Sequence, residues 1–130
     1  MKKGFVCGCF DIIHPGYIKL LEEARSKCDW LIVGLQTDPT LDRPEKNKPV
    51  QTYEERELIL KSIRYVDQAI KYETESDLYR LLKKLKPDVW IMGTDKLDTK
   101  YTGYDLKINT FYHNRSNYSS TKLKQQIQDG

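Results

Sequence analysis

Hydrophobic residues along the chain fall into five short runs, which alternate with longer segments whose apolar positions recur at helical spacing. Short apolar runs are typical of buried strands, and a period of 3.6 residues is typical of helices packed on a sheet. The predicted strands cover residues 5–10, 30–35, 66–72, 88–92 and 107–112. The predicted helices cover residues 15–27, 52–63, 76–85 and 120–128.

Local signals support the starts of two of these helices. Pro15 stands where the first helix begins, a position at which the missing N–H of proline costs nothing. Thr52 and Glu55 have the spacing of a capping box, in which each residue's side chain caps the other's backbone amide. This box is expected to open the second helix.

The alternation of strand and helix predicts an α/β fold with helices on both faces of one sheet. We expect a single Rossmann-like, doubly wound domain over residues 1–130, with a five-stranded parallel sheet. In such sheets, ligands bind at the carboxyl ends of the strands, near the point where the strand order reverses. Three segments follow strands and should meet at that edge: residues 8–17, 38–51 and 113–118. The second of them has no period and holds three prolines, so it is predicted to be a mobile basic loop.

Composition narrows the class of protein. The chain has 130 residues, enough for one compact domain that needs no disulfide or metal to fold. Its 22 basic and 19 acidic residues give a net charge of +3, too small to indicate binding to nucleic acid or a membrane surface. Polar residues from Asp11 onward break the first apolar run too early for a signal peptide, and no stretch approaches the roughly 20 apolar residues of a membrane span. The cytoplasm is therefore the expected compartment.

The three cysteines, Cys7, Cys9 and Cys28, are interpreted as buried reduced thiols. An odd number of cysteines argues against a disulfide framework. No second pair of Cys or His residues completes a zinc site beside the C-x-C sequence.

The stretch GCFDIIHPGY, residues 8–17, is the first candidate site. A strand leads into a glycine-bearing turn and then into the start of a helix, where backbone N–H groups attract phosphates. Gly16 allows a ligand to approach closely, and His14 is able to donate to a phosphate oxygen. The alternative interpretation is that His14 only caps the helix.

Two more candidate anion sites are expected at the same edge. The basic loop offers cations that can close on a triphosphate, or that are simply solvated: Arg43, Lys46 and Lys48. The last turn offers a cation and hydroxyls before a helix, where ordinary N-capping is the alternative: Arg115, Ser119, Ser120 and Thr121. No Ser/His/Asp set, H-E-x-x-H or Walker sequence is evident. Transfer to a phosphate acceptor needs none of them, because that oxygen is already anionic and catalysis is then mainly alignment and charge stabilisation.

These residues also follow a known family pattern. The motif G-x-F-D-x-x-H-x-G-H opens the cytidylyltransferases, and the matching positions here are Gly8, Phe10, Asp11, His14 and Gly16. Further matching stretches are residues 37–38, 53–56, 63–67, 91–93 and 119–122. Over essentially its full length the chain resembles the cytidylyltransferases of the nucleotidyltransferase superfamily, and the glycerol-3-phosphate cytidylyltransferases most of all. HPGY stands where the motif has H-x-G-H, so Tyr17 replaces the second histidine.

The resemblance implies a reaction and a set of roles. CMP would move from CTP to a small phosphorylated alcohol or sugar, with Mg²⁺ and with release of pyrophosphate, in a homodimer. The implied catalytic residues are His14, Tyr17, Lys46 and Arg115. The implied nucleotide-binding residues are Gly8, Cys9, Phe10, Asp11, Gly16, Gly93, Ser119, Ser120 and Thr121. Lys48 and Arg64 are implied on the acceptor side; the choice between Lys46 and Lys48 stays open, and a subunit contact is the alternative for Arg64.

Tyr17 bears on the rate of such a reaction. Tyrosine keeps a hydroxyl donor but loses the cationic form of histidine, because its pKa is about 10. The side chain can reach the phosphate, fill the phosphate's place, or pack on the apolar face of the first helix. Losing one transition-state donor typically costs about 10²- to 10³-fold in rate, which would give a slow enzyme.

The sequence therefore favours a cytidylyltransferase slowed by Tyr17. The alternative is a catalytically degenerate, nucleotide-binding dimer with a regulatory or scaffold role. A third hypothesis keeps the transfer chemistry but uses ATP. A nucleic-acid module rests only on the Lys and Arg content and on late aromatic residues, for which strand and loop packing is the commoner explanation.

Overall fold

The structure is a computed structural model that describes residues 1–94 and 100–114. Its strands are β1 (Lys3–Gly8), β2 (Trp30–Gln36), β3 (Gln68–Tyr72), β4 (Val89–Gly93) and β5 (Thr110–His113). Its helices are α1 (Pro15–Ser26), α2 (Tyr53–Lys61) and α3 (Glu75–Leu85), with short 3₁₀ turns η1 (Pro39–Leu41) and η3 (Tyr104–Leu106). None of the helices in this described part is long and apolar enough to cross a bilayer.

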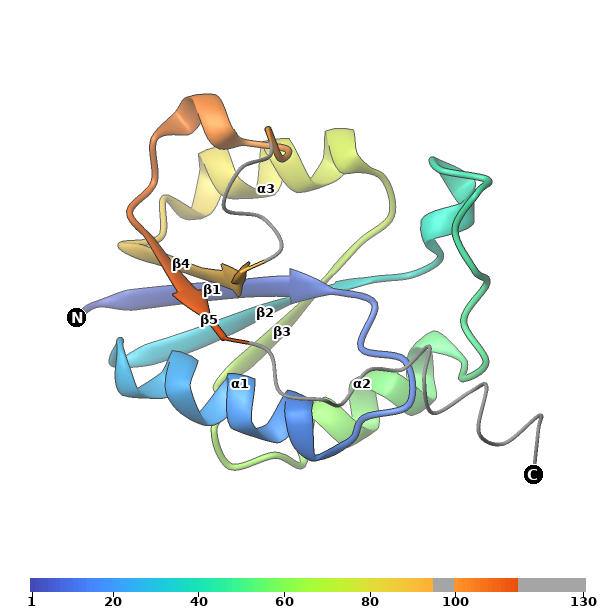
Figure 1. Ribbon diagram of the computed structural model, residues 1–130, viewed down its shortest axis with the longest axis horizontal. Helices are drawn as coiled ribbons and strands as arrows, with labels where there is room; N and C mark the ends of the chain where they lie inside the picture. Colours follow the sequence, from blue (N-terminus) through green and yellow to red (C-terminus); the bar gives the residue numbers. More distant parts are fainter. Residues whose placement is uncertain (95–99, 115–130) are drawn as a thin grey trace.

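All the strand pairs are parallel, and the sheet order is β3-β2-β1-β4-β5. The chain builds outward from β1 through β2 to β3, and then crosses back to place β4 on the other side of β1 (Figure 1). The predicted five-stranded parallel sheet is confirmed. The strand order reverses between β1 and β4, where a cleft at the carboxyl edge is expected.

Helices cover both faces of the sheet, as predicted. Figure 1 shows α1 and α2 on one face and α3 on the other. Each face has its own apolar core. The α1/α2 core includes Leu21, Leu60 and Ile91, and the α3 core includes Phe5, Leu78 and Trp90.

The capping box at the second helix is confirmed: the Thr52 hydroxyl accepts from the Glu55 amide at 3.1 Å, and the Glu55 carboxylate accepts from the Thr52 amide at 2.8 Å. A second box, formed by Thr74 and Asp77, begins α3. The middle elements start and end within about two residues of the predicted bounds, which is the usual uncertainty of helix ends. The predicted helix over residues 120–128 lies outside the described residues.

The first and last strands differ from the prediction. The first strand ends at Gly8 rather than at residue 10, because Phe10 and Ile12 have φ values of 50° and 56°, which turn the chain away from the sheet. Phe10 is nevertheless buried, which explains why its hydrophobicity extended the predicted strand. The fifth strand starts at Thr110 rather than at residue 107, because Lys107 has a left-handed backbone after η3.

The cysteines are thiols rather than disulfides. Burial was predicted for all three, and it holds for Cys28, whose pKa is raised by its removal from water. Cys7 and Cys9 are only half-buried, which corrects that prediction, because they lie where β1 ends at the open edge of the sheet.

Candidate functional site

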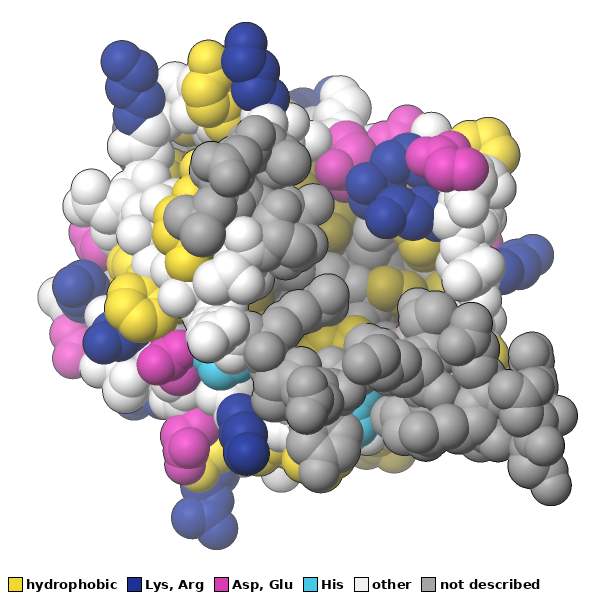
Figure 2. Space-filling view, viewed as in Figure 1, with side chains coloured by type: hydrophobic (Ala, Val, Ile, Leu, Met, Phe, Trp, Pro, Cys, Tyr) yellow, Lys and Arg dark blue, Asp and Glu magenta, His cyan; other side chains and the backbone are white. Residues whose placement is uncertain are grey.

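A cavity of about 410 Å³ opens at the carboxyl edge of the sheet. Figure 2 shows the hollow near the centre of this face. Every strand contributes to its lining at or near its last residue: Gly8 of β1, Gln36 of β2, Tyr72 of β3, Gly93 of β4 and His113 of β5. The predicted convergence of strand ends at one site is therefore present for the described part of the chain.

His14 lies at the start of α1 and lines this cavity. Its Nδ1 accepts from the backbone amide of Gly16 at 3.1 Å, so it caps the helix. A ring nitrogen that accepts carries no hydrogen, which puts the hydrogen of the neutral imidazole on Nε2. His14 can therefore cap the helix and also line the cavity. The cap uses Nδ1, and in the neutral ring the hydrogen is on Nε2.

Tyr17 packs between two aromatic rings. Its ring centroid lies 4.4 Å from that of His14 and 5.2 Å from that of Phe10. Tyr17 also lines the cavity. Tyr17 also packs against the core cluster that holds Leu21 and Ala24 of α1, which confirms the packing interpretation, and a direct role toward a phosphate stays a prediction.

Asp11 shapes the turn before α1 rather than lining the cavity. Its carboxylate accepts from the backbone amides of Val50 and Gln51 at 2.8 and 3.0 Å, and the Gln51 side chain accepts from the Ile12 amide at 3.0 Å. The carboxylate is buried, so these bonds fix the end of the basic loop against the turn. These bonds give Asp11 a positioning role, and its nucleotide-binding role stays a prediction.

Arg56 of α2 is a buried cation that sequence reasoning missed as part of the site. It is 1% exposed, and its guanidinium donates to the carbonyls of Cys9, Gln36 and Thr37 at 2.6–2.8 Å. These bonds hold the residues that follow β1 and β2 at fixed positions. One available signal was the helical spacing of Arg56 and Leu60, which places Arg56 on the apolar face of α2.

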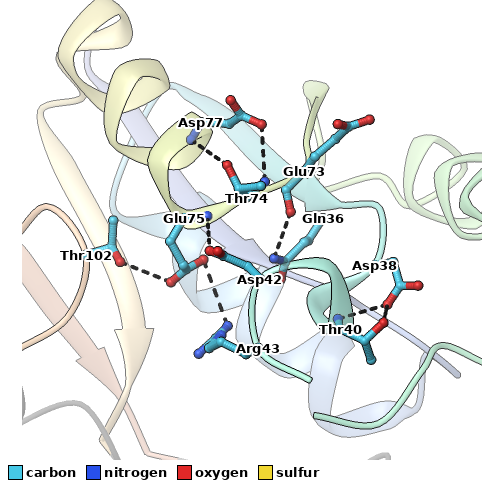
Figure 3. Close-up of polar contacts among 10 residues, drawn as sticks. All are labelled: Gln36, Asp38, Thr40, Asp42, Arg43, Glu73, Thr74, Glu75, Asp77 and Thr102. Atoms are coloured by element: carbon cyan, nitrogen blue, oxygen red, sulfur yellow. Dashed lines mark hydrogen bonds and ion pairs between the residues drawn. The ribbon is translucent and has the colours of Figure 1, made fainter. Parts of the chain in front are cut away.

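One side of the cavity is polar (Figure 3). The cluster that we call the Glu75 network consists of Asp42, Arg43, Glu75 and Thr102. The Glu75 carboxylate accepts from the Thr102 hydroxyl at 3.0 Å and lies 3.9 Å from the Arg43 guanidinium, while the Asp42 carboxylate accepts from the Glu75 amide at 2.8 Å. The network joins the loop after β2, the start of α3 and the chain beyond β4.

The buried Tyr72 hydroxyl lies beside this network. Burial, reinforced by the neighbouring Cys7 thiol, raises the pKa of Tyr72 far above its ordinary value. Tyr72 therefore stays a neutral hydroxyl at any physiological pH. Together with Gln36, which is also buried, it gives this side of the cavity uncharged hydrogen-bonding groups next to the charged pair.

The opposite side of the cavity contains a second histidine, which sequence reasoning placed only in a polar turn. His113 Nδ1 lies 2.6 Å from the Glu23 carboxylate of α1. His113 is also the register partner of Gly93 at the end of the sheet. The available signal was that each of the chain's two histidines follows or ends a predicted strand at the carboxyl edge.

The structure brings most of the described predicted residues to the cavity. Its lining includes Gly8, Cys9, Phe10, His14, Gly16, Tyr17, Lys46 and Gly93. Among the described residues, Asp11, Lys48 and Arg64 do not line it. Arg64 lies between α2 and the first residue of β3, at the amino edge of the sheet and away from the cavity, so its predicted acceptor role stays a prediction. Four predicted residues lie outside the described part: Arg115, Ser119, Ser120 and Thr121.

Of the two loop lysines, the structure favours Lys46. Lys46 lines the cavity beside Arg43, and both are in the segment after η1. Within residues 1–94 and 100–114, no group of three or more His, Cys, Asp or Glu side chains is arranged to hold a metal ion. The site as described can therefore supply hydrogen-bond donors, cations and a helix N-terminus, which is the chemistry of phosphate binding.

Comparison with known proteins agrees with this geometry. A family model described as cytidylyltransferase-like matches residues 5–126. The bifunctional protein HldE of Caulobacter vibrioides is 37% identical over 107 residues, which are 82% of this chain and 22% of that protein. The chain thus spans about a fifth of the length of such relatives.

Solved structures share the fold. A lipopolysaccharide core biosynthesis protein from Thermoplasma volcanium matches with a TM-score of 0.71 and 27% identity, over 92% of this chain and 99% of that one. A pantoate-beta-alanine ligase from Francisella tularensis matches with a TM-score of 0.58 and 19% identity, over 98% of this chain and 69% of that one. The second likeness concerns the fold alone.

Proposed function

The chain belongs to the cytidylyltransferase-like family, and we propose that it transfers CMP from CTP to a small phosphorylated alcohol or sugar, forming a CDP product and pyrophosphate. The observation that carries the proposal is the junction of β1 and α1. His14 caps α1 there, and the N-terminus of this helix, with Gly16, lies at the cavity. This cavity lies where the strand order of the sheet reverses.

The described residues suit a transfer that relies on alignment. The acceptor phosphate is already anionic, so its oxygen attacks the α-phosphorus of the nucleotide without a general base, and pyrophosphate leaves. His14, with the hydrogen of its neutral ring on Nε2, would donate to the α-phosphate oxygen as charge develops there. Lys46 and the first-turn amides of α1 would hold the phosphates.

Magnesium fits this site as part of the nucleotide substrate. Mg²⁺ is commonly held by substrate phosphates with few protein ligands. When bound, it would neutralise charge on the phosphates.

The Glu75 network supports an acceptor that carries several hydroxyl groups. A carboxylate and a guanidinium, next to the amide of Gln36 and the hydroxyl of Tyr72, offer both acceptors and donors to an alcohol or a sugar. The Thermoplasma volcanium protein, with its part in lipopolysaccharide core biosynthesis, favours the sugar. We therefore propose sugar phosphates as the first acceptors to examine.

A second candidate is a nucleotide-binding protein without turnover. It is favoured by the position of Tyr17, whose ring occupies the space between His14 and Phe10 where the family motif has a histidine.

The implied homodimer also stays a proposal. In it, the exposed Arg64 would serve a subunit contact, and sedimentation of the wild type beside Arg64→Glu would test that role.

Pyrophosphate release is the deciding measurement. Wild type, Tyr17→His and His14→Ala should be assayed with CTP or ATP and Mg²⁺, against sugar phosphates and glycerol phosphate. We expect multiple turnovers with CTP, their loss in His14→Ala, and preserved or faster turnover in Tyr17→His. CTP binding without turnover, with activity appearing only in Tyr17→His, would establish the second candidate instead. Turnover confined to ATP would correct the donor.

A further inference from the structure

His113 lines the same cavity as His14 and Gly16, and its ring contacts the Glu23 carboxylate of α1. Glu23 lies eight residues after Pro15 on α1, which is about 12 Å along the helix axis. That separation is within the length of an extended nucleoside triphosphate. Because His113 lines that cavity and contacts Glu23, a nucleotide whose phosphates lie at His14 and Gly16 would have its base within reach of His113.

The contacts of His113 fix the direction of its ring. His113 follows Phe111 by two residues on β5, and Phe111 packs on the α1/α2 core, so both side chains lie on the α1 face of the sheet. The side chain of His113 is 13% exposed, and that of Glu23 is 38% exposed. His113 is thus mostly buried and lines the cavity, whereas Glu23 stays partly exposed to water.

The hydrogen bond also fixes which nitrogen carries the hydrogen. An ionised carboxylate only accepts, so His113 Nδ1 must donate across the 2.6 Å contact with Glu23. In the neutral ring, Nε2 is then left with a lone pair and is an acceptor. His113 differs in this respect from His14, whose Nδ1 accepts and whose Nε2 therefore donates.

An acceptor at this place distinguishes nucleobases by one substituent. Cytosine and adenine carry an exocyclic amino group, which donates, where uracil and guanine carry a carbonyl oxygen, which accepts. If His113 Nε2 faces the carbonyl oxygen of uracil or guanine, both atoms are acceptors and no hydrogen bond forms between them. A buried polar group without a hydrogen bond costs free energy.

We propose that Glu23 and His113 form a base-reading pair, in which His113 Nε2 accepts from the amino group of cytosine or adenine and Glu23 holds the ring in the accepting tautomer. The inference rests on the proposed function, since it requires a nucleotide in the cavity. It names a specificity residue, His113, and a positioning residue, Glu23. It also explains how the site would reject UTP and GTP.

Two pairs of nucleotides isolate the amino group. CTP and UTP differ at the 4-position of the pyrimidine, and ATP and inosine triphosphate differ at the 6-position of the purine. Dissociation constants for all four, with Mg²⁺, are to be measured by calorimetry on the wild type. We expect the amino member of at least one pair to bind about 5- to 150-fold more tightly, the range for one unsatisfied buried group. The pair that shows the difference identifies the donor nucleotide.

Variants separate base reading from a structural role. In Glu23→Gln the side-chain amide donates or accepts equally well, so the ring tautomer is no longer fixed and the affinity ratio within the pair should fall to near one. His113→Phe removes the acceptor and should do the same. Glu22→Gln is the matched control: it removes the same charge one residue away, where Glu22 accepts from the Tyr65 hydroxyl at 2.9 Å, and it should keep the wild-type ratio.

The outcomes are distinct. Equal binding of all four nucleotides by the wild type would overturn the base-reading pair and leave the proposed function standing. A preference that survives both Glu23→Gln and His113→Phe would also overturn it. Binding of none of the four would refute the proposed function itself. Thermal unfolding of each variant without ligand shows that a lost ratio does not come from a lost fold.

Discussion

Arg56→Lys tests the main structural claim about the site, that one guanidinium fixes the ends of two strands. The substitution keeps the positive charge but removes the planar fork, whose Nη1 donates to Cys9 and Gln36 and whose Nη2 donates to Thr37. A lysine ammonium is a compact donor on a different stem and cannot reproduce that geometry. One or two of these three carbonyls then lose their donor.

The expected magnitude follows from those bonds. A hydrogen bond that involves a charged group contributes about 1.5–3 kcal/mol, so losing one or two lowers the free energy of unfolding by about 3 kcal/mol. For a domain of this size that corresponds to a fall in Tm of about 12 °C. Under the proposed function CTP should also bind more weakly, because Cys9 lines the cavity and its carbonyl is one of the three.

Urea unfolding followed by circular dichroism measures the change. The midpoint should fall at an unchanged m value, as expected for a loss of stability without a change in the surface exposed. Arg80→Lys is the matched control, because Arg80 is exposed on α3 and pairs with Asp77 at the surface. That change should cost less than about 0.5 kcal/mol. If the two variants lose equal stability, Arg56 does not organise the site.

Two other predictions concern packing and pH. Gly34→Ala should lower the free energy of unfolding by about 1–3 kcal/mol, because its Cβ would lie 2.8 Å from the Phe5 ring; an unchanged Tm would contradict this. Burial, then the hydrogen bond to Glu57, raises the pKa of Tyr53 from 10.0 to about 12. Because its pKa is raised, Tyr53 keeps its proton to a higher pH in the folded state than in the unfolded state. Its contribution to the free energy of unfolding is therefore complete below pH 10 and is lost as the pH rises from 10 to 12. Tyr53→Phe should flatten that fall in urea titrations at alkaline pH, and an identical slope would refute the assignment.

The sheet could be predicted because its signals are local. The three central strands, β2, β1 and β4, contain short apolar runs, and Thr52 with Glu55 forms its capping box within four residues of chain. The same reasoning fails where a hydrophobic residue is buried but its backbone is not extended. Phe10 is buried but has left the strand, and Ile12, a β-branched residue, has a positive φ that no propensity scale favours.

The missed parts of the site depend on distant partners. Arg56 is buried against carbonyls that lie 19 to 47 residues away, whereas an arginine in a short helix is ordinarily exposed. Glu23 and His113 are 90 residues apart. Asp11 was assigned to the nucleotide from its motif, although its hydrogen bonds show that its carboxylate holds the loop. The motif singled out Asp11, and only the fold showed what its carboxylate contacts.

The replacement of the second motif histidine by Tyr17 is best understood from its neighbours. His14 is held by its cap on the Gly16 amide and by the ring of Tyr17, which itself rests on Phe10. An aromatic residue at position 17 therefore preserves the orientation of His14, whatever it does to the phosphate directly. Under the proposed function, Tyr17 in place of histidine loses one cationic donor, while loss of His14 would remove both a donor and the helix cap. We accordingly expect activity to depend on His14 far more than on the identity of residue 17.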